Sequence, residues 1–579
     1  METLHTQVVI VGAGLTGSIL ANKLSQAGVR VLLVDYGEQL FFDPETGEDQ
    51  RQPIIDRLYA STSRPPNGPY VRLNKGYSGP QMPVEDNLGE YYQGPAYAKE
   101  PTGDTFKSTY TRVVGGTTWH WLGTCLRYLP STFKEKTLFN RGADWPIGYE
   151  DLERWYWEAE KEIGVAGDDA VTPEIPRFGR SFPMPLILPS YSDRRIAERW
   201  AGLSFEGHPV RVESTPQARN SIPYQGRPPC AGSVNCVPLC PIQAKYDATV
   251  HLKRAINPRL DPENKRDSVP AKLLIRTAAL RLETGAGGKI TGLVVRRLDL
   301  GTDQRIEAKQ YILTTHGIEI PRLLFYSKPG VGGQRGGLAN SSGLVGRYLM
   351  DHNIRIAYGV ADEPMYPFRG PLSTSGVESL RDGAFRRHRG AFRVEIENIG
   401  ANWALNAPFG DVKALVAQGL YGKKLDRKLA WRVGTQVQLD ALIEPEAQFD
   451  SNVSLSDVKD PQTGVPLPKV SFVIDDYTKR GAAAFEVFAR QALKALGSSD
   501  EDVKFADGFF PAGHVMGTCR MGDDPHTSVA DSYGRTHDHP NLHITGSALF
   551  PTVDAANPTL TIVALTLRAV DNILKSLHH

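Results

Sequence analysis

The sequence predicts an α/β protein in which a dinucleotide-binding domain is split along the chain and a second, α+β domain is inserted into it. Two observations lead to this fold class. A strand, a glycine-rich turn, a helix and a second strand open the chain, and loop motifs with a final helix return after residue 505. Between them, residues 351–500 show alternating β-type segments and then a helical pattern. The first domain is therefore expected to be of the Rossmann type.

The opening βαβ unit carries a specific motif. An apolar strand runs into Gly12-Ala13-Gly14-Leu15-Thr16-Gly17, and the next strand ends at Asp35. Glycines at 12, 14 and 17 let the backbone approach a pyrophosphate at a helix N-terminus, where N–H groups and the helix dipole favour an anion. Asp35 is then placed to accept hydrogen bonds from the adenosine ribose. The unit therefore predicts a cofactor with an adenosine half.

The predicted domain boundaries follow changes in this pattern. Residues 41–110 lose the periodicity and are rich in Gly, Pro and Tyr, which favours a long excursion or lid over the cofactor. The cofactor-binding domain is expected at 1–40, 111–150, 211–350 and 505–579. The inserted substrate domain is expected at 151–210 and 351–504.

The overall charge of the chain argues against several classes of partner. Lys and Arg total 66 against 65 Asp and Glu, so no net field favours nucleic acid or an anionic membrane. No uncharged apolar stretch approaches the roughly 20 residues of a membrane helix. The apolar run 8–20 lacks a basic leader and contains three glycines, so we expect no signal peptide there. A small neutral substrate fits this balance.

Three of the five cysteines are crowded into one short segment. They follow the pattern Cys230-x5-Cys236-x3-Cys240-Pro241. Thiolates at loop spacings followed by proline are typical of iron–sulfur ligation. Zinc is the rival, but a structural zinc site needs four ligands, and His251 is a weak candidate for the fourth. Unpaired buried cysteines are the remaining alternative, and core packing is expected for the two single cysteines, Cys125 and Cys519.

Beyond the N-terminal glycine loop, four segments give the chain a resemblance that extends from end to end. They are GGTTWHW at 115–121, THGIEIP at 315–321, GRYLMDH at 346–352 and HVMGT at 514–518. With these motifs the chain resembles the glucose–methanol–choline (GMC) oxidoreductase family. Within it, the chain is most similar to the large catalytic subunits of bacterial FAD-dependent sugar dehydrogenases, with glucoside 3-dehydrogenases as close relatives. The resemblance implies a GMC fold that binds FAD.

The resemblance also implies the catalytic pair. Hydride leaves a carbinol readily only when a base removes the hydroxyl proton, and the histidine of the HxxGT segment, His514, takes that role. Asn557, followed by proline, matches the second position, where an amide can orient the hydroxyl but cannot act as the base. Gly546 and Asn557 are also expected beside the cofactor. The family commonly has Asp-Ala where this chain has Gly546-Ser547-Ala548, and this departure leaves the contacts to the ribityl chain and the pyrophosphate open.

The same resemblance implies how the cofactors are held. A histidine in a glycine-rich turn such as Gly115-Gly116…His120 is joined covalently to the flavin in flavoproteins of this subgroup. The alternative is a histidine packed by aromatic residues beside the isoalloxazine. Gly115 and Gly116 are expected to allow close backbone approach to the cofactor. In the related sugar dehydrogenases a cysteine triple at this place holds a 3Fe–4S cluster.

Together these features predict an FAD-dependent dehydrogenase that oxidises a hydroxyl of a sugar or glycoside. A cluster beside the flavin is useful for one-electron acceptors, which favours a dehydrogenase over an oxygen-using oxidase. A non-redox lyase on the same fold and a pure electron carrier are the other readings, and His514 with Asn557 argues against the carrier. The resemblance implies a small export subunit that bears the signal, a cytochrome c acceptor and a periplasmic location; a cytoplasmic location is the alternative. The oxidised carbon stays open.

Overall fold

The computed structural model describes most of the chain. The described residues are 1–37, 40–52, 55, 98–104, 106–108, 110–170, 175–232, 236, 239–264, 266–328, 336–399 and 409–578. Most of the predicted excursion at 41–110 therefore lies outside the described residues.

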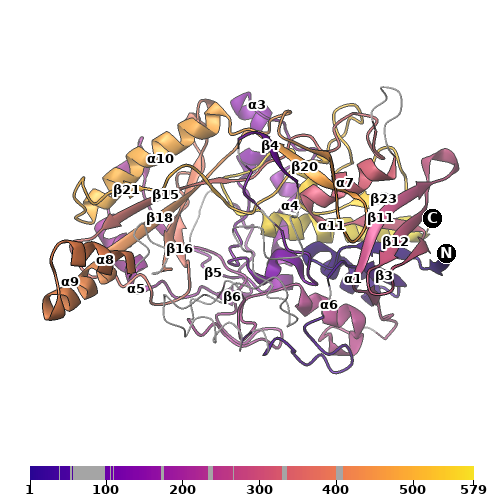
Figure 1. Ribbon diagram of the computed structural model, residues 1–579, viewed down its shortest axis with the longest axis horizontal. Helices are drawn as coiled ribbons and strands as arrows, with labels where there is room; N and C mark the ends of the chain where they lie inside the picture. The colour runs from indigo at the N-terminus through magenta and orange to yellow at the C-terminus, as the bar shows by residue number, and fades with distance from the viewer. Residues whose placement is uncertain are drawn as a thin grey trace.

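A five-stranded parallel sheet forms the centre of the first structural unit, at the right in Figure 1. Its order is β10 (Lys272–Leu274), β3 (Val31–Val34), β2 (Val8–Val11), β14 (Gln310–Leu313), β23 (Leu542–Ile544). Each neighbouring pair is parallel. The runs VVIV and VLLV are buried along their whole length, as expected of a parallel sheet covered on both faces. The predicted Rossmann-type core is confirmed.

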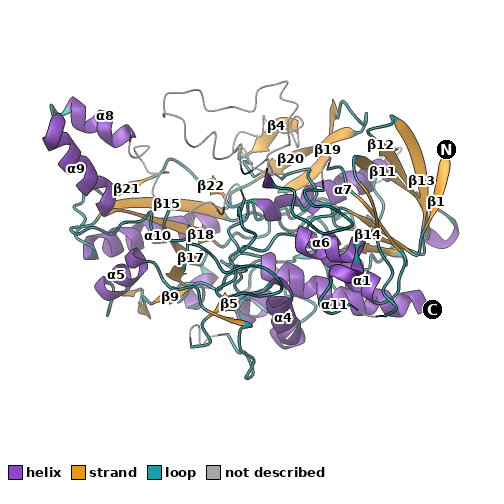
Figure 2. Cartoon of the chain, turned by 90° about the horizontal axis from the view of Figure 1, so that it is seen from below, coloured by secondary structure: helices purple, strands orange, loops and turns teal. Residues whose placement is uncertain are grey.

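Helices cover one face of this sheet. Val8, Ile10 and Leu33 point toward them and form one apolar cluster with residues of α1, α6 and α11. The helices lie side by side at the lower right of Figure 2. Their bounds are α1 Leu15–Gln26, α6 Thr249–Ile256 and α11 Thr559–His578. Because α11 ends the chain, the last residues complete the domain that the first residues begin.

The opposite face carries a mostly antiparallel sheet, in which only β1 and β13 pair in parallel, and α7 (His316–Ser327). Val9 and Val11 pack in the same cluster as Leu282 and Val295 of that sheet. Its order is β1 (Glu2–His5), β13 (Thr302–Glu307), β12 (Ile290–Arg297), β11 (Thr277–Thr284). The first unit therefore has three layers: the helices α1, α6 and α11, the parallel sheet, and this mostly antiparallel sheet with α7.

The start of α7 differs from the prediction. Proline is common at the first position of a helix, so the sequence alone predicts a helix from Pro321, but the helix begins at His316 and includes the proline. Proline lacks the N–H that would bond the carbonyl four residues earlier, at Gly317. That carbonyl instead accepts a 2.7 Å hydrogen bond from the Thr518 hydroxyl. The missing backbone bond is thus replaced by a side chain of the HVMGT segment.

A second, antiparallel sheet lies at the left in Figure 1 and forms the second structural unit. Its order is β21 (Lys504–Phe505), β15 (Asn353–Val360), β18 (Gln436–Ile443), β17 (Phe392–Glu397), β16 (Ser375–Val377), β9 (Val212–Ser214), with β22 (Phe510–Pro511) also on β15. Helix α10 (Asp476–Ala495) packs on one face through Phe485 and Phe488, against Val394 and Leu439. The other face is turned away from α10.

The strand pairing shifts the predicted domain edges. Strands β9 and β22 belong to segments predicted in the cofactor-binding domain, yet both pair with the second sheet. Conversely, a three-stranded sheet packs on α7 although two of its strands fall in the predicted substrate domain. It contains β19 (Asn452–Lys459), β20 (Pro466–Phe472) and β4 (Ala98–Gly103). Long-range pairing of this kind leaves no local sequence signal.

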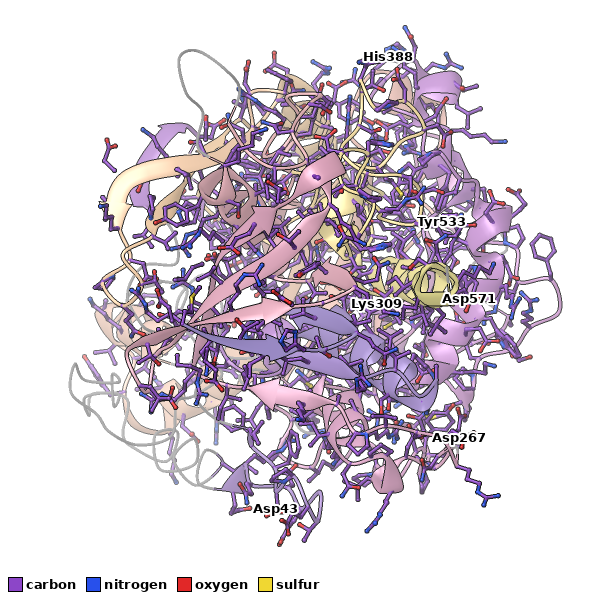
Figure 3. All side chains as sticks on the ribbon, turned by 90° about the vertical axis from the view of Figure 1, so that its right-hand side faces the viewer. Asp43, Asp267, Lys309, His388, Tyr533 and Asp571 are labelled. Carbon is purple, nitrogen blue, oxygen red and sulfur yellow. The ribbon has the colours of Figure 1, made fainter. Side chains whose placement is uncertain are left out.

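The remaining described elements are mostly short, except α4 (Tyr149–Ile163), which packs in the main core against α11. They are α3 (Glu135–Phe139), α4, α5 (Tyr191–Arg199), α8 (Phe409–Ala417), α9 (Gly422–Thr435), β5 (Ala166–Gly167), β6 (Met184–Pro185), β7 (Ser204–Phe205), β8 (His208–Pro209) and several 3₁₀ turns. Among the described helices, none has the length and apolar character needed to cross a bilayer. Charged side chains of both signs, such as Lys309 and Asp571, project from the end that carries β1 (Figure 3).

Candidate active site

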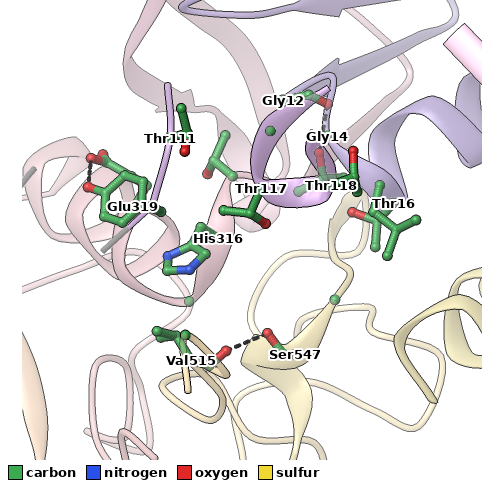
Figure 4. Close-up of a pocket in the computed structure, with 18 of the residues that line it drawn as sticks. Gly12, Gly14, Thr16, Thr111, Thr117, Thr118, His316, Glu319, Val515 and Ser547 are labelled. Carbon is green, nitrogen blue, oxygen red and sulfur yellow. Dashed lines mark hydrogen bonds between the residues drawn. The ribbon is translucent and has the colours of Figure 1, made fainter. Parts of the chain in front are cut away.

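A cavity of about 530 Å³ lies between the two structural units. It is lined by the glycine loop and the Thr117–Thr118 turn on one side, and by Ile354, Glu395 and Leu442 of the second sheet on the other. Figure 4 shows Gly12, Gly14, Thr117, His316 and Ser547 around this space. Of the residues predicted from the sequence, eight line it: Gly12, Gly14, Asp35, Gly116, His120, His514, Gly546 and Asn557.

The glycine loop leaves room for an anion at the start of α1. A Cβ at Gly17 would lie 1.9 Å from the carbonyl oxygen of Gly12, so no side chain fits at Gly17, which lies behind the cavity. A Cβ at Gly14, by contrast, would meet nothing within 4 Å. Gly14 is also the N-cap of α1 and gives no side-chain cap, so the first N–H groups of the helix face open space. This arrangement fits a pyrophosphate.

Asp35 fixes the shape of the loop as well as lining the cavity. Its two carboxylate oxygens accept hydrogen bonds of 2.7 Å from the backbone N–H groups of Ala13 and Gly37. Burial raises the pKa of Asp35, and these two bonds oppose that shift. Each oxygen keeps a second lone pair for a ribose hydroxyl. The predicted role in cofactor binding is therefore compatible with this geometry.

A hydrogen bond of Trp119 stabilises the turn that contains His120. Gly115 adopts φ 92°, and the Trp119 indole N–H donates to the Val114 carbonyl at 2.8 Å. A Cβ at Gly115 would lie 2.6 Å from that indole nitrogen. Gly115 therefore does not line the cavity as expected; its missing side chain makes room for Trp119. Gly116 does line the cavity, and a Cβ there would lie 3.4 Å from the Cα of Gly14.

His514 and Asn557 come together from two loops, 43 residues apart. The Asn557 amide Nδ2 lies 3.3 Å from His514 Nε2. The amide oxygen of Asn557 is buried and accepts no hydrogen bond within the described part of the chain. A substrate hydroxyl in the cavity can reach a base and an acceptor at this place.

A second histidine, His352, stands behind His514 and received no role in the sequence analysis. Its Nδ1 lies 2.9 Å from His514 Nδ1, and its Nε2 lies 2.6 Å from the Asp554 carbonyl oxygen. The backbone N–H of His514 also donates to Asp351 at 2.9 Å. The only sequence signal was the position of His352 in the GRYLMDH segment, because the contact spans 162 residues.

The Asp554 carbonyl determines the tautomers of both histidines. A carbonyl only accepts, so neutral His352 carries its proton on Nε2, and its Nδ1 must accept. His514 therefore donates from Nδ1, which leaves the lone pair on its Nε2 facing Asn557. Burial lowers the pKa of His352 to about 4. Burial, followed by the nearby His352 and Arg393, holds the pKa of His514 well below 6.5. His514 is thus an unprotonated imidazole at neutral pH.

This electrostatic setting predicts the acid limb of the pH profile. Because Nε2 of His514 stays unprotonated until the pH falls well below 6.5, kcat/KM should stay flat from neutral pH through 6.5 and decline only in more acidic solution. Steady-state rates across the acid range, with flavin retention checked at each pH, provide the measurement. An inflection at or above 6.5 would contradict the assignment.

His316 is a further cavity residue that the sequence analysis missed. It adopts φ 81°, a left-handed conformation that is unusual for a residue with a side chain. Its ring stacks on Tyr110 at 4.6 Å, and Tyr110 bonds Glu319, which pairs with Arg112 at 2.9 Å. Burial lowers the pKa of His316 to about 4. A positive φ at a residue other than glycine cannot be predicted from the sequence, so this feature of His316 was not foreseen.

The cysteine segment lies directly behind the His120 turn. Lys245 Nζ donates to the carbonyl oxygens of Cys236 and Trp119, each at 2.8 Å, and to that of Trp121. Burial raises the pKa of the Cys230 thiol; neighbouring Arg219 lowers it, and the charges of Cys236 and Cys240 raise it. Cys236 and Cys240 therefore lie close enough to Cys230 to influence its charge.

The described residues do not by themselves assemble a metal site. Within them, no group of three or more His, Cys, Asp or Glu side chains is arranged to hold an ion. His251 is engaged elsewhere, with Tyr246 at 2.6 Å and Glu162 at 2.8 Å. Cys125 and Cys519 are buried in the main core, as expected. Cys230, Cys236 and Cys240 are free thiols, and the cation Arg219 lies close to Cys230.

Two family models match the chain. The model described as FAD binding domain matches residues 5–44, and the model described as GMC oxidoreductase matches residues 447–566. The first covers the glycine loop and Asp35, and the second covers the segment that contains His514 and Asn557. The fold and these matches define an FAD-dependent oxidoreductase.

Full-length relatives place the chain more closely. It is 34% identical to the fructose dehydrogenase large subunit of Gluconobacter japonicus, over 100% of this chain and 99% of the relative. It is 28% identical to paromamine 6'-oxidase of Streptomyces fradiae, over 97% and 90%. It is 26% identical to 2-methyl-1,2-propanediol dehydrogenase of Mycolicibacterium austroafricanum, over 98% and 95%. The chain belongs to the GMC oxidoreductase family.

Solved structures agree on the fold. Pyridoxine 4-oxidase from Mesorbium loti matches with TM-score 0.59 and 18% identity, over 99% of each chain. Formate oxidase matches with TM-score 0.60 and 15% identity, over 100% of each chain. The predicted GMC fold is thus confirmed.

Proposed function

We propose that this protein is a sugar or glycoside dehydrogenase in which His514 is the catalytic base. The observation that carries the proposal is the chain from the Asp554 carbonyl through His352 to His514, which leaves an unprotonated Nε2 facing the cavity beside Asn557. The relatives are named for a sugar and for an alcohol, which supports a substrate CH–OH group.

The residues of the chain perform the proton half of the reaction. The substrate hydroxyl donates to His514 Nε2, and the Asn557 amide oxygen accepts from a neighbouring hydroxyl and so orients the carbinol. FAD, when bound along the glycine loop, supplies the hydride acceptor. As the proton moves to Nε2, His514 becomes cationic while its Nδ1–H stays bonded to His352, which keeps the imidazole in this orientation.

The covalent attachment of the flavin to His120 is part of the proposal. If it forms, acid precipitation of the wild-type protein should leave the flavin with the protein, whereas His120→Ala should release it into the supernatant. Peptide mass spectrometry checks the mass of flavin on the segment that contains His120. Complete release of the flavin from the wild-type protein would refute the covalent link, and His120 would then only pack beside the flavin.

We further propose that Cys230, Cys236 and Cys240 hold an iron–sulfur cluster, of the 3Fe–4S type. Its support is the set of three thiols in one loop, tied by Lys245 to the turn of His120 and near the cation Arg219. Burial lowers the pKa of Lys245 to about 8, and the nearby Cys236 and Cys240 raise it. Thiolates there would keep this lysine charged. A cluster at this place supplies one-electron transfer away from the flavin.

The similarity to the large subunit of a fructose dehydrogenase also supports a proposal for the partners of this protein. They are a small export subunit and a cytochrome c acceptor, with a periplasmic location for the assembly. The test of the function is turnover of the purified protein against a panel of sugars and glycosides, with an artificial acceptor or with oxygen alone. We expect rapid turnover with the dye and little with oxygen. Faster turnover with oxygen would favour an oxidase.

A further inference from the structure

Residues 314–317 lie along the cavity between the glycine loop and the HVMGT segment. At one end, the Thr314 hydroxyl donates to the carbonyl oxygen of Gly12 at 2.9 Å. At the other end, a Cβ on Gly317 would lie 3.2 Å from Cγ1 of Val515, the second residue of the HVMGT segment. This stretch therefore reaches from the loop that fits a pyrophosphate to the loop of the proposed base.

A second stretch, residues 545–547, runs beside the first. Its first residue donates from its backbone N–H to the Leu313 carbonyl oxygen at 3.0 Å, because β23 lies beside β14 in the parallel sheet. Its last residue, Ser547, donates to the Val515 carbonyl oxygen at 2.6 Å, as Figure 4 shows. Both stretches line the cavity beyond the carboxyl ends of parallel strands, which is where sheets of this kind bind ligands.

Polar groups of these two stretches face the cavity without a partner in the described part of the chain. The hydroxyl oxygens of Thr315 and Thr545 are buried and make no hydrogen bond there. His316 Nδ1 accepts from the backbone N–H of Ile318 at 3.4 Å, so the neutral ring carries its proton on Nε2. Among the described residues this Nε2–H has no acceptor. Buried polar groups without partners are costly, which indicates that a ligand satisfies them.

His316 keeps a side chain at a backbone conformation that suits glycine. Its φ of 81° is left-handed and strains a residue that has a Cβ. Such strain is concentrated at binding and catalytic sites, where the side chain has a role. Figure 4 shows the imidazole in the cavity between Thr117 and Val515. Tyr110 stacks on the ring at 4.6 Å, which orients the ring and leaves its edge for a ligand.

We propose that His316 binds the ribityl chain of FAD, donating its Nε2–H to one ribityl oxygen, with the hydroxyls of Thr315 and Thr545 as further partners. This inference rests on the proposed function, because it requires FAD in the cavity. FAD that reaches from the glycine loop to His514 has its ribityl chain in the middle, where the two stretches run. Ribityl hydroxyls both donate and accept, so they match one fixed donor and two hydroxyls.

The test removes the imidazole without straining the backbone. In the His120→Ala background no covalent link to the flavin can form at that position, so FAD is exchangeable. His316→Gly in this background adopts the left-handed conformation freely. Titration of the apoprotein with FAD, followed by calorimetry, should show about 10-fold weaker binding than in the parent. Equal affinities would overturn the proposal.

Deoxy analogues of FAD distinguish a direct contact from an indirect effect. Three analogues, which lack the ribityl hydroxyl at 2′, 3′ or 4′, are titrated into the parent and into His316→Gly. The analogue without the bonded oxygen should bind both proteins within about twofold, because the contact is already absent. A difference of the same size with all three analogues would overturn the contact.

A second variant tests the neighbouring hydroxyl. Thr545→Val removes a buried hydroxyl that has no partner in the described residues, so the apoprotein should be at least as stable to heat as the parent. It should nevertheless bind FAD several-fold more weakly. Unchanged FAD affinity in Thr545→Val would remove this hydroxyl from the site and so contradict the proposal.

Phe178→Gly is the matched control for the backbone. Phe178 also has a positive φ, 47°, but it is 66% exposed and does not line this cavity. Its glycine variant should bind FAD as tightly as the parent. A loss equal to that of His316→Gly would assign the effect to the backbone and overturn the proposal.

The two proposals fail in different ways. If a sugar reduces the flavin but FAD affinity does not depend on His316, the dehydrogenase stands and the ribityl contact is wrong. If the affinity depends on His316 and on one ribityl hydroxyl while none of the sugars reduces the flavin, the contact stands and the proposed function is wrong.

Discussion

The His514→Ala enzyme should lose ~10² to 10⁴ in turnover while it still binds FAD, because removal of the hydroxyl proton in the transition state is lost. His514 lines the cavity but makes no structural ion pair among the described residues, and its backbone bond to Asp351 survives the substitution. Stopped-flow flavin reduction by the best substrate of the panel gives the rate, and the flavin spectrum reports retention.

Two variants calibrate this loss. Asn557→Ala should lose less, since it removes the orienting amide and leaves the base. His526→Ala changes an exposed histidine on a loop and should match wild type. Wild-type rates of flavin reduction in the His514 variant would remove this histidine from the mechanism.

Replacing Cys236 with serine should abolish electron delivery to a cytochrome c while flavin reduction by sugar persists. A serine oxygen is a poorer ligand than thiolate for iron in a sulfide-rich core, so the cluster should be lost or disturbed. The catalytic pair lies on other loops and needs no cluster to remove a proton. Iron analysis and electron paramagnetic resonance follow the cluster, and cytochrome reduction follows its function.

Cys125→Ala is the matched control for the cluster, because it removes a buried thiol outside the loop. It should keep the iron content and the resonance signal of wild type. Absence of iron from anaerobically prepared wild type would refute the cluster. So would unchanged cytochrome reduction in a Cys236→Ser enzyme that has lost its iron.

The parts of the fold that local sequence determines were predicted well. The opening βαβ unit depends on contiguous residues, and β2, α1 and β3 lie where the glycine motif places them. The predicted start of α7 was wrong because a proline such as Pro321 is common at the first position of a helix, whereas α7 begins at His316. Its lost backbone bond is compensated by Thr518, which is 201 residues from Gly317. No local pattern contains that contact.

Site residues could be predicted from the sequence only where a short contiguous motif indicates the role of the residue. His514, Asn557 and most of the glycines line one cavity, as their motifs suggested. His352 and Glu395 were not foreseen as cavity or site residues, since the first acts through a contact between distant loops and the second reaches the cavity through strand register. Register sets which side chains face each other, and one residue of slip would send Glu395 to the opposite face.

The central claim is that a sugar carbinol, whose hydroxyl proton goes to His514, gives the hydride of its C–H bond to FAD in this cavity. Anaerobic mixing of the FAD-loaded protein with fructose, glucose and a panel of glycosides, followed by flavin absorbance, tests it directly. We predict that at least one of these compounds bleaches the flavin rapidly without any added acceptor. A flavin that dithionite reduces but that stays oxidised with every sugar and glycoside of the panel would contradict the account.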